Sequence, residues 1–319
     1  MENKLIRLGF LFLILLNPLK ADQSVVTYDF SGGRFGDNLL SYLHAKWFSY
    51  EHGLPLLYKP FPYSSSLVLH AKEIHYRDRA LRKKLGLRPS FKTTLAKWSF
   101  YSKIPFFSFC YQCPYFPEDP SELVGGGFFS FKVNWKDERF RDMLRELIAP
   151  LGPMAIIKPP PDRMSVALHI RDGGGFDQGY YRLELPLKFP PLSFYIDGLK
   201  YILTLFPDQP IYCHLFTDAQ NPEELVKNIQ QSLPVNSLIE FNYRKENNRH
   251  DANILEDFFS LFEFQALIRP SSNFSIIPSL LKDYAIVYAP KTFRSDGKSV
   301  VIREADIQIN ENIYQRWRQ

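Results

Sequence analysis

From Met164 onward the chain alternates strand-like and helix-like segments, and no other feature of the sequence constrains the fold as much. The strand-like segments are short, apolar and rich in β-branched or aromatic residues, as buried strands are. The segments between them are amphipathic and long enough for helices. The predicted strands are 164–170, 211–218, 238–244, 266–270 and 285–290, and the last of these is the final strand that we expect. The predicted helices between them are 191–205, 222–233, 252–264 and 271–284. This alternation predicts an α/β fold, with a parallel sheet covered by helices on both faces.

Polar residues follow four of these strands at the point where the chain leaves the sheet. His169 and Arg171 stand two residues apart, so both project from one face of the first strand. Thr217 and Asp218 end the strand at 211–218, the loop before Asp251 follows the strand at 238–244, and the sequence SSNFS at 271–275 follows the strand at 266–270. Ligands bind at this carboxyl edge of open α/β sheets, and a guanidinium beside a helix start suits a diphosphate. The simpler alternative is an arginine in a salt bridge at the strand end, with a histidine in the core.

The chain before residue 150 contains one clear unit. A strand-like run at 24–30 leads into the glycine-rich turn SGGRFG at 31–36 and then into an amphipathic helix at 37–52. Gly53 stands where a helix C-cap belongs, and Asp37 stands near the helix start, where a carboxylate is favourable. Glycine turns of this kind direct backbone N–H groups at anions, although the turn alone is a weak signal.

Two stretches of the first half have a less regular pattern. Basic residues dominate 72–103, which predicts a solvated helical face, with contact to an anionic membrane surface or an acidic acceptor as the alternative. Cys110 and Cys113 form a C-x-x-C in an aromatic, proline-rich stretch at 100–118 that we expect to be a packed loop. Because no second ligand pair is nearby, they predict structural thiols or one local disulfide and not a zinc site.

Five prolines between residues 149 and 163 mark a linker, and an amphipathic helix is expected just before it at 136–148. We therefore divide the chain after residue 21 into a domain at 22–150, a linker at 151–163 and a domain at 164–319.

The first 21 residues resemble a targeting segment. Lys4 and Arg7 precede an unbroken apolar run from Leu8 to Leu16, and Ala21 offers a small residue for cleavage. The run is short for a membrane span, which needs about 20 residues, so we expect a signal peptide, with an uncleaved membrane anchor as the alternative. The protein is then exported or membrane-associated, or it lies at the cytoplasmic face of a membrane.

The net charge of +5 fits an anionic ligand such as a nucleotide diphosphate but is too weak to indicate a nucleic-acid partner. A dehydrogenase is disfavoured because no G-x-G-x-x-G stands in a strand–helix turn.

Several segments, in order along the chain, resemble the superfamily of GDP-fucose-dependent fucosyltransferases, particularly the α-1,2-fucosyltransferases and their α-1,6 and protein O-fucosylating relatives. SGGRFGDNLLSYLHAKW resembles the superfamily's first block, GGGFFSF its middle segment, and ALHIRDGG its H-x-R-R-G-D motif. HLFTD resembles its F-S-D, and NILEDFFSLFEFQALIRPSSNFS resembles its E-D segment followed by N-S-S-F-S. Together these segments span nearly the whole mature chain.

The resemblance implies a GT-B fold, in which two Rossmann-like domains face each other across a cleft. The domain at 22–150 would be the acceptor-side domain, and the domain at 164–319 would bind the nucleotide-sugar donor. The implied reaction is an inverting transfer of fucose from GDP-fucose, or of a sugar from a related nucleotide sugar, to a glycan or other hydroxyl acceptor. It implies no metal and no other cofactor. By position, Arg171 would hold the diphosphate and stabilise the departing GDP, and His169 and Asp218 would lie near the guanine and ribose. The phosphate-binding loop would be Ser272, Asn273, Phe274 and Ser275, and the first domain would border the reaction centre with Gly33, Arg34, Gly36, Asp37 and Asn38.

The chain also departs from the superfamily's pattern. Asp172 replaces the second arginine of H-x-R-R, and Asp37 with Asn38 replaces the usual Asn-Gln. Asp37 and Asp177 are the candidates for the base that deprotonates the acceptor hydroxyl. Their alternatives are a helix cap for Asp37 and a surface loop position for Asp177. The alternative function is a degenerate transferase fold that binds carbohydrate or nucleotide without catalysis.

Overall fold

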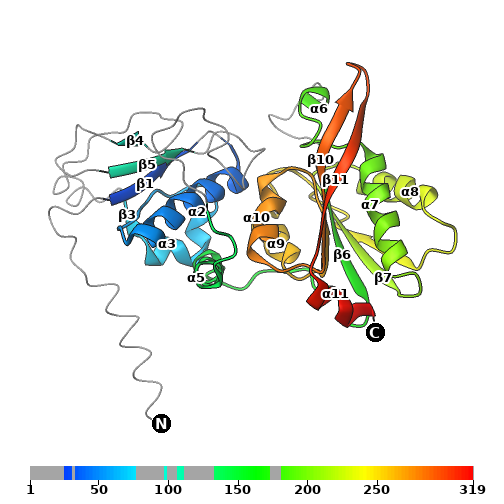
Figure 1. Ribbon diagram of the computed structural model, residues 1–319, viewed down its shortest axis with the longest axis horizontal. Helices are drawn as coiled ribbons and strands as arrows, with labels where there is room; N and C mark the ends of the chain where they lie inside the picture. The colour runs from blue at the N-terminus through cyan, green and yellow to red at the C-terminus, as the bar shows by residue number, and fades with distance from the viewer. Residues whose placement is uncertain are drawn as a thin grey trace, which may run out of the picture.

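A computed structural model describes residues 25–30, 33–76, 97–98, 106–110, 133–172 and 181–318 (Figure 1). The expected targeting segment at 1–21, the GGGFFSF segment, Cys113 and Asp177 lie outside the described residues. So does most of the basic stretch, of which the described parts include the short strands β3 (Ile74–His75) and β4 (Lys97–Trp98). The predicted helical face therefore stays a prediction. Among the described residues, no helix is both long and apolar enough to cross a membrane.

The second half of the chain forms a six-stranded sheet in the order β11-β10-β9-β6-β7-β8. Its strands are β6 (Met164–Ile170), β7 (Ile211–Thr217), β8 (Ile239–Tyr243), β9 (Ala266–Ile268), β10 (Ile286–Ser295) and β11 (Val300–Ile309). All neighbours pair in parallel except β10 and β11. The prediction of an α/β fold with a mostly parallel sheet is confirmed.

Helices cover both faces of this sheet (Figure 1). The helices of the second half of the chain are α6 (Tyr181–Glu184), α7 (Leu192–Leu205), α8 (Pro222–Ser232), α9 (Ile254–Leu261), α10 (Asn273–Leu281) and α11 (Glu311–Arg318). Helices α7 and α8 lie on one side of the sheet and α9 and α10 on the other, facing the first half of the chain. The side chain of Asn221 caps α8 by accepting a hydrogen bond from the Glu224 N–H, as a residue before a proline-started helix commonly does.

The end of the chain differs from the prediction. Residues 285–290 are not the final strand, because β10 continues to Ser295 and turns through residues 296–299 into the antiparallel strand β11. The outer part of this hairpin is exposed and carries little apolar alternation, so its sequence lacks the usual signal of a half-buried strand.

The first half builds smaller sheets around one long helix. Strand β1 (Val25–Asp29) pairs in parallel with β5 (Phe106–Cys110), and β4 pairs with β5. The sequence predicted a loop at Cys110, but in the structure this residue is the last residue of strand β5. The remaining elements are α2 (Phe35–His52), β2 (Leu57–Tyr58), a 3-10 turn (Ser64–Ser66), α3 (Val68–Lys72) and α5 (Glu138–Ile148). As predicted, Gly53 caps α2 in the left-handed conformation, with φ 63°.

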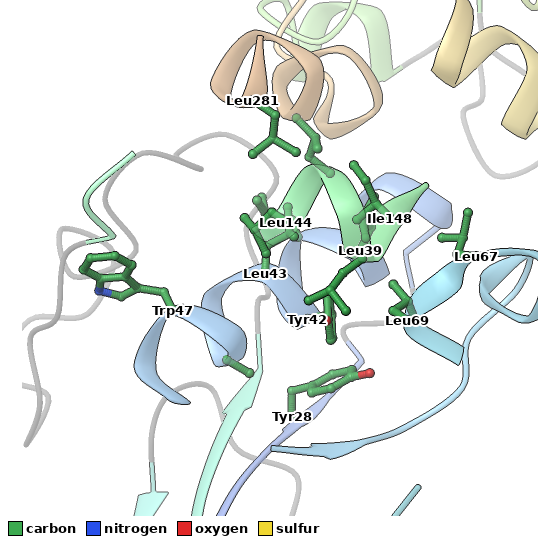
Figure 2. Packing of buried hydrophobic residues seen from close by; sticks show 14 of the residues in the cluster. Tyr28, Leu39, Tyr42, Leu43, Trp47, Leu67, Leu69, Leu144, Ile148 and Leu281 are labelled. Carbon is green, nitrogen blue, oxygen red and sulfur yellow. The ribbon is translucent and has the colours of Figure 1, made fainter. Parts of the chain in front are cut away.

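One hydrophobic cluster joins the two halves. Its residues come from α2, α3 and α5 and also from α9 and α10, which contribute Phe258, Phe259, Ile277 and Leu281. Figure 2 shows Leu281 facing the leucines of α2 and α5. Burial of apolar surface is the main stabilising term in folding, so this shared core holds α10 against α2. The proline-rich stretch at 149–163 is also attached, because the Ile157 N–H donates to Ser260 Oγ at 2.8 Å.

Candidate functional site

A cavity of about 330 Å³ opens at the carboxyl edge of the six-stranded sheet. Residues from both halves of the chain line it. From the first half these are residues 33–37, Pro62 and Tyr63; from the second they are His169, Arg171, Lys188, 216–218, 249–252, Ile254, Asp257 and 271–274. Strand ends that are far apart in the sequence therefore converge on one cavity, as the sequence predicted.

Arg171 extends from the end of β6 toward the start of α10. Its Nη1 donates to Ser272 Oγ at 3.4 Å, and its guanidinium carbon lies 5.3 Å from the centre of the buried Phe189 ring. Ser272 is the N-cap of α10. A helix start leaves its first N–H groups without intrahelical acceptors and carries a partial positive charge, so guanidinium and helix together form an environment suited to an anion.

His169 lies behind Arg171 in the wall of the cavity and is almost fully buried. Its Nδ1 lies 2.7 Å from Ser275 Oγ, and its ring packs beside Phe274 with 5.5 Å between ring centres. Burial, reinforced by the charges of Arg171 and Arg269, lowers the pKa of His169 to about 3. The imidazole is therefore neutral at physiological pH and acts as a hydrogen-bonding group and not as a cation.

Asp218 joins the ends of two neighbouring strands. It follows β7, and its Oδ1 accepts a hydrogen bond from the Asp172 N–H at 2.7 Å, just beyond β6. Asp172, which departs from the superfamily's arginine, thus contributes its backbone to this contact. Asp218 lines the cavity next to Thr217 and can accept hydrogen bonds from a bound hydroxyl or amine there.

Asp37 connects the starts of α2 and α10. Its Oδ2 accepts a hydrogen bond from the Arg34 N–H at 3.0 Å, which is the capping contact expected at the start of α2. Its Oδ1 accepts from Asn273 Nδ2 at 2.6 Å, across a sequence separation of 236 residues. The carboxylate therefore lies between two helix N-termini, where backbone dipoles favour negative charge.

Gly36 allows the close approach of these two helices. A Cβ atom added at this position would lie 2.6 Å from the backbone nitrogen of Phe274 and 2.8 Å from the carbonyl carbon of Asn273. Only a residue without a Cβ permits this contact between backbones. The glycine in SGGRFG that follows Phe35 thus serves helix packing at the site.

Two predicted site residues lie outside the cavity lining. Asn38 is buried behind it, and its Nδ2 donates to the Gly33 carbonyl at 3.3 Å. Ser275 is fully buried and contacts His169 and not the cavity. Both support residues in the wall. The position of Asp177 lies outside the described residues.

The structure adds lining residues that the sequence alone did not single out. Asp257, in the first turn of α9, accepts a hydrogen bond at Oδ1 from Arg244 Nη2 at 2.8 Å. Burial raises the pKa of Asp257 above its usual value, against the opposing effect of Arg244. Tyr63 enters from the loop before α3. The E-D pair of the E-D…N-S-S-F-S segment offered a signal for Asp257, whereas nothing in the sequence pointed to Tyr63.

A second, more polar cavity of about 650 Å³ adjoins the first and shares Asp218, Arg249 and His250 with it. Its other lining residues are Asp172, Ala219, Gln220, Asn221, Glu224, Leu225, Asn228 and Asn248. The carboxyl edge of the sheet is therefore open on both sides of Asp218.

A mostly parallel sheet that is covered by helices on both faces is the arrangement of a Rossmann-like α/β fold, and the cavity lies at the carboxyl edge where such folds bind ligands. Among solved structures, the fold is similar to that of GDP-fucose fucosyltransferases, as the sequence resemblance predicted. A FUT1 variant from Arabidopsis thaliana in complex with GDP aligns with a TM-score of 0.51 and 12% identity, covering 86% of this chain and 71% of that chain. The fucosyltransferase NodZ from Bradyrhizobium aligns with a TM-score of 0.45 and 16% identity, covering 91% of this chain and 99% of that one.

POFUT1 in complex with GDP-fucose aligns with a TM-score of 0.41 and 12% identity, covering 83% of this chain and 95% of that one. At these identities the likeness is one of fold. No family model matches the sequence, and no curated protein matches it.

Proposed function

We propose that this protein is a glycosyltransferase that transfers fucose from GDP-fucose to a hydroxyl of a glycan acceptor. The observation that carries the proposal is the convergence of Arg171 with the start of α10 in a cavity lined by both halves of the chain. The FUT1 structure of similar fold contains GDP, which supports the nucleotide but leaves the sugar and acceptor to this proposal. In this account the two halves are the Rossmann-like domains of a GT-B enzyme, facing across the cavity.

The donor's diphosphate would bind between Arg171 and the N-terminus of α10, near Ser272, Asn273 and Phe274. This placement is supported by charge, because the guanidinium and the helix dipole both favour a dianion. The nucleoside would extend toward Asp218, with the neutral His169 as a hydrogen-bonding group. In Rossmann-like folds a carboxylate near the end of the second strand is a usual partner of ribose hydroxyls.

The transfer itself would be a direct displacement that inverts the anomeric carbon. The acceptor oxygen forms a bond to that carbon while the bond to the β-phosphate oxygen breaks, and GDP leaves with the electron pair. Arg171 and the helix start would stabilise the charge that develops on the diphosphate, so the mechanism requires no metal. The acceptor's proton would pass to a carboxylate, for which Asp37 and Asp177 remain the candidates.

One observation favours the alternative of a binding protein without catalysis. Both carboxylate oxygens of Asp37 already accept hydrogen bonds, from the Arg34 N–H and from Asn273 Nδ2. An acceptor hydroxyl would have to compete with these two donors for the oxygens of the carboxylate. A binding protein would take up GDP but would release no fucose from GDP-fucose.

The test is turnover of GDP-fucose by the purified protein, measured as GDP release with and without a mixture of neutral glycans. We expect slow release to water and faster release with acceptor, and both should be lost in Arg171→Ala. GDP binding without turnover would support the alternative, and absence of GDP binding would contradict both functions.

The cellular location is a separate proposal. We propose that residues 1–21 direct export or attach the protein to a membrane, with the cytoplasmic face of a membrane as the alternative. Expression of the full chain and of a chain lacking these residues, followed by fractionation, tests this. Equal distribution of both forms would contradict it.

A further inference from the structure

Tyr63 has an unusual backbone conformation for its residue type. It adopts the left-handed conformation, with φ 68° and ψ −12°. The other non-glycine residues with positive φ in the described part of the chain are Asn247 and Asn253, and asparagine tolerates this region. A tyrosine there is strained, and strain of this kind persists at functional sites when surrounding contacts enforce it.

The contacts around Tyr63 hold its ring in place. The ring meets Phe35 edge-to-face, with 6.2 Å between centres, and Phe35 meets Phe258 in the same manner at 5.2 Å. The Tyr63 hydroxyl donates to the carbonyl oxygen of Asp251 at 3.2 Å. Phe35 and Phe258, which belong to the hydrophobic cluster shared by the two halves, thus support the Tyr63 ring. The loop before α9 holds the Tyr63 hydroxyl.

The ring nevertheless remains accessible. Tyr63 is 40% exposed, in contrast to the buried Phe35 beneath it, and it lines the same cavity as Arg171 and Ser272. Arg249, His250 and Asp251 also line that cavity and come from the loop that the Tyr63 hydroxyl contacts. A rigid aromatic surface is therefore accompanied by side chains that donate and accept hydrogen bonds.

This combination matches the chemistry of a sugar ring. A pyranose has an apolar face of C–H groups, which packs against the electron-rich face of an aromatic ring, and a rim of hydroxyls, which need polar partners. A ring that is already fixed loses little conformational entropy when the ligand binds.

We infer that Tyr63 is the platform on which a sugar ring of a neutral glycan acceptor packs, with residues 249–251 binding its hydroxyls. The inference rests on the proposed function, since the same cavity would hold the donor. The family resemblance placed the acceptor on the side of the first half of the chain, and the inference adds a particular residue, Tyr63, and the loop at 249–251 to that site. The competing explanation is that Tyr63 only ties the two halves together through its hydroxyl.

The experiment compares Tyr63→Gly, Tyr63→Asn and Tyr63→Phe in the full chain. Glycine and asparagine suit the left-handed backbone but remove the ring, so both should fold; phenylalanine keeps the ring and removes the hydroxyl. Saturation-transfer NMR with GDP present measures binding of chitotetraose, cellotetraose and xylotetraose, and melting temperature and GDP affinity are recorded for every variant.

We expect the wild-type protein to bind at least one of these glycans through the C–H face of a sugar ring. Tyr63→Gly and Tyr63→Asn should weaken that binding by about tenfold. Tyr63→Phe should retain it, and GDP affinity should not change. Absence of glycan binding by the wild type, or full binding by Tyr63→Gly, would overturn the inference. If Tyr63→Phe loses binding as fully as Tyr63→Gly, the hydroxyl tie and not the platform is responsible. Failure of the wild type to bind GDP would instead refute the proposed function.

Discussion

Arg171 is the residue on which the proposed chemistry depends most. Its geometry suits a planar guanidinium, because it contacts Ser272 Oγ while stacking near Phe189. Lysine keeps the positive charge but lacks the fork of donors and the flat surface. We expect Arg171→Lys to lower turnover of GDP-fucose by about 100-fold, as loss of a transition-state donor does. Unchanged kcat in this variant would contradict the assigned role.

Substitution of Asp37 can distinguish a contribution to helix capping from a contribution to proton transfer. Asparagine can still accept the Arg34 N–H hydrogen bond, so Asp37→Asn should keep the start of α2 intact while removing a base. If Asp37 is the base, kcat should fall by about 100-fold with little change in GDP affinity. Asp257→Asn is the matched control, since it removes another carboxylate from the same cavity. Equal kcat in Asp37→Asn and the wild type would leave Asp177 as the candidate.

The lowered pKa of His169 should make the free energy of unfolding depend on pH. Its pKa is about 3 in the folded chain and about 6.5 when exposed in the unfolded chain. Between these two pKa values the unfolded chain binds a proton at His169 that the folded chain does not bind. The contribution of neutral His169 to the free energy of unfolding is therefore complete above about pH 6.5 and is lost as the pH falls toward about 3. His214, whose folded pKa is about 4 for similar reasons, adds to this loss.

Replacing His169 with glutamine should therefore flatten the acid limb of the stability curve by an amount on the order of a few kcal/mol. Urea unfolding between pH 4 and pH 7 measures this. An identical pH dependence in His169→Gln and the wild type would show that the residue does not change its protonation on unfolding.

The starts of α2 and α10 form the structural element that unites the site. Gly36→Ala would place a Cβ against backbone atoms of Asn273 and Phe274, which cannot rotate away as a side chain can. We expect a loss of stability of about 1–3 kcal/mol together with weaker GDP binding. Gly152→Ala is the control, because no atom lies within 4 Å of the added Cβ. If both variants melt at the wild-type temperature, the helices are not packed as described.

The elements that the sequence predicted well are those with strong local signals. Helix α2 ends at Gly53 and α8 begins after Asn221, because caps and proline act over a few residues. Strand β11 escaped prediction because its exposed residues do not alternate cleanly between apolar and polar. Strand β5 escaped because its aromatic and proline-rich surroundings resemble those of a loop.

The residues of the candidate site also include some that the sequence could predict and others that it could not. Arg171, Asp218 and the segment beginning with Ser272 could be predicted, since the carboxyl ends of parallel strands meet at one edge. Tyr63 could not, because its partner Asp251 is 188 residues away and the two residues meet only in the folded chain. The hydrogen bond between Asp37 and Asn273 could not be predicted either, because these two residues are 236 positions apart in the sequence.

The core shared by α2, α5, α9 and α10 makes the proposed nucleotide site and the overall fold interdependent. A ligand that binds only the folded chain raises its stability, by roughly 2–3 kcal/mol at a hundredfold excess over Kd. GDP should therefore protect both halves together and not the second half alone.

The proposed nucleotide site around Arg171 and the start of α10 can be tested by calorimetric titration of the full chain with GDP, repeated with ADP and UDP and with Arg171→Ala. We expect saturable binding of GDP by the wild-type protein, weaker or undetectable binding of the other nucleotides, and loss of GDP binding in the variant. A wild-type protein that fails to bind GDP, or a variant that binds it as tightly as the wild type, would contradict the nucleotide site described for Arg171 and α10.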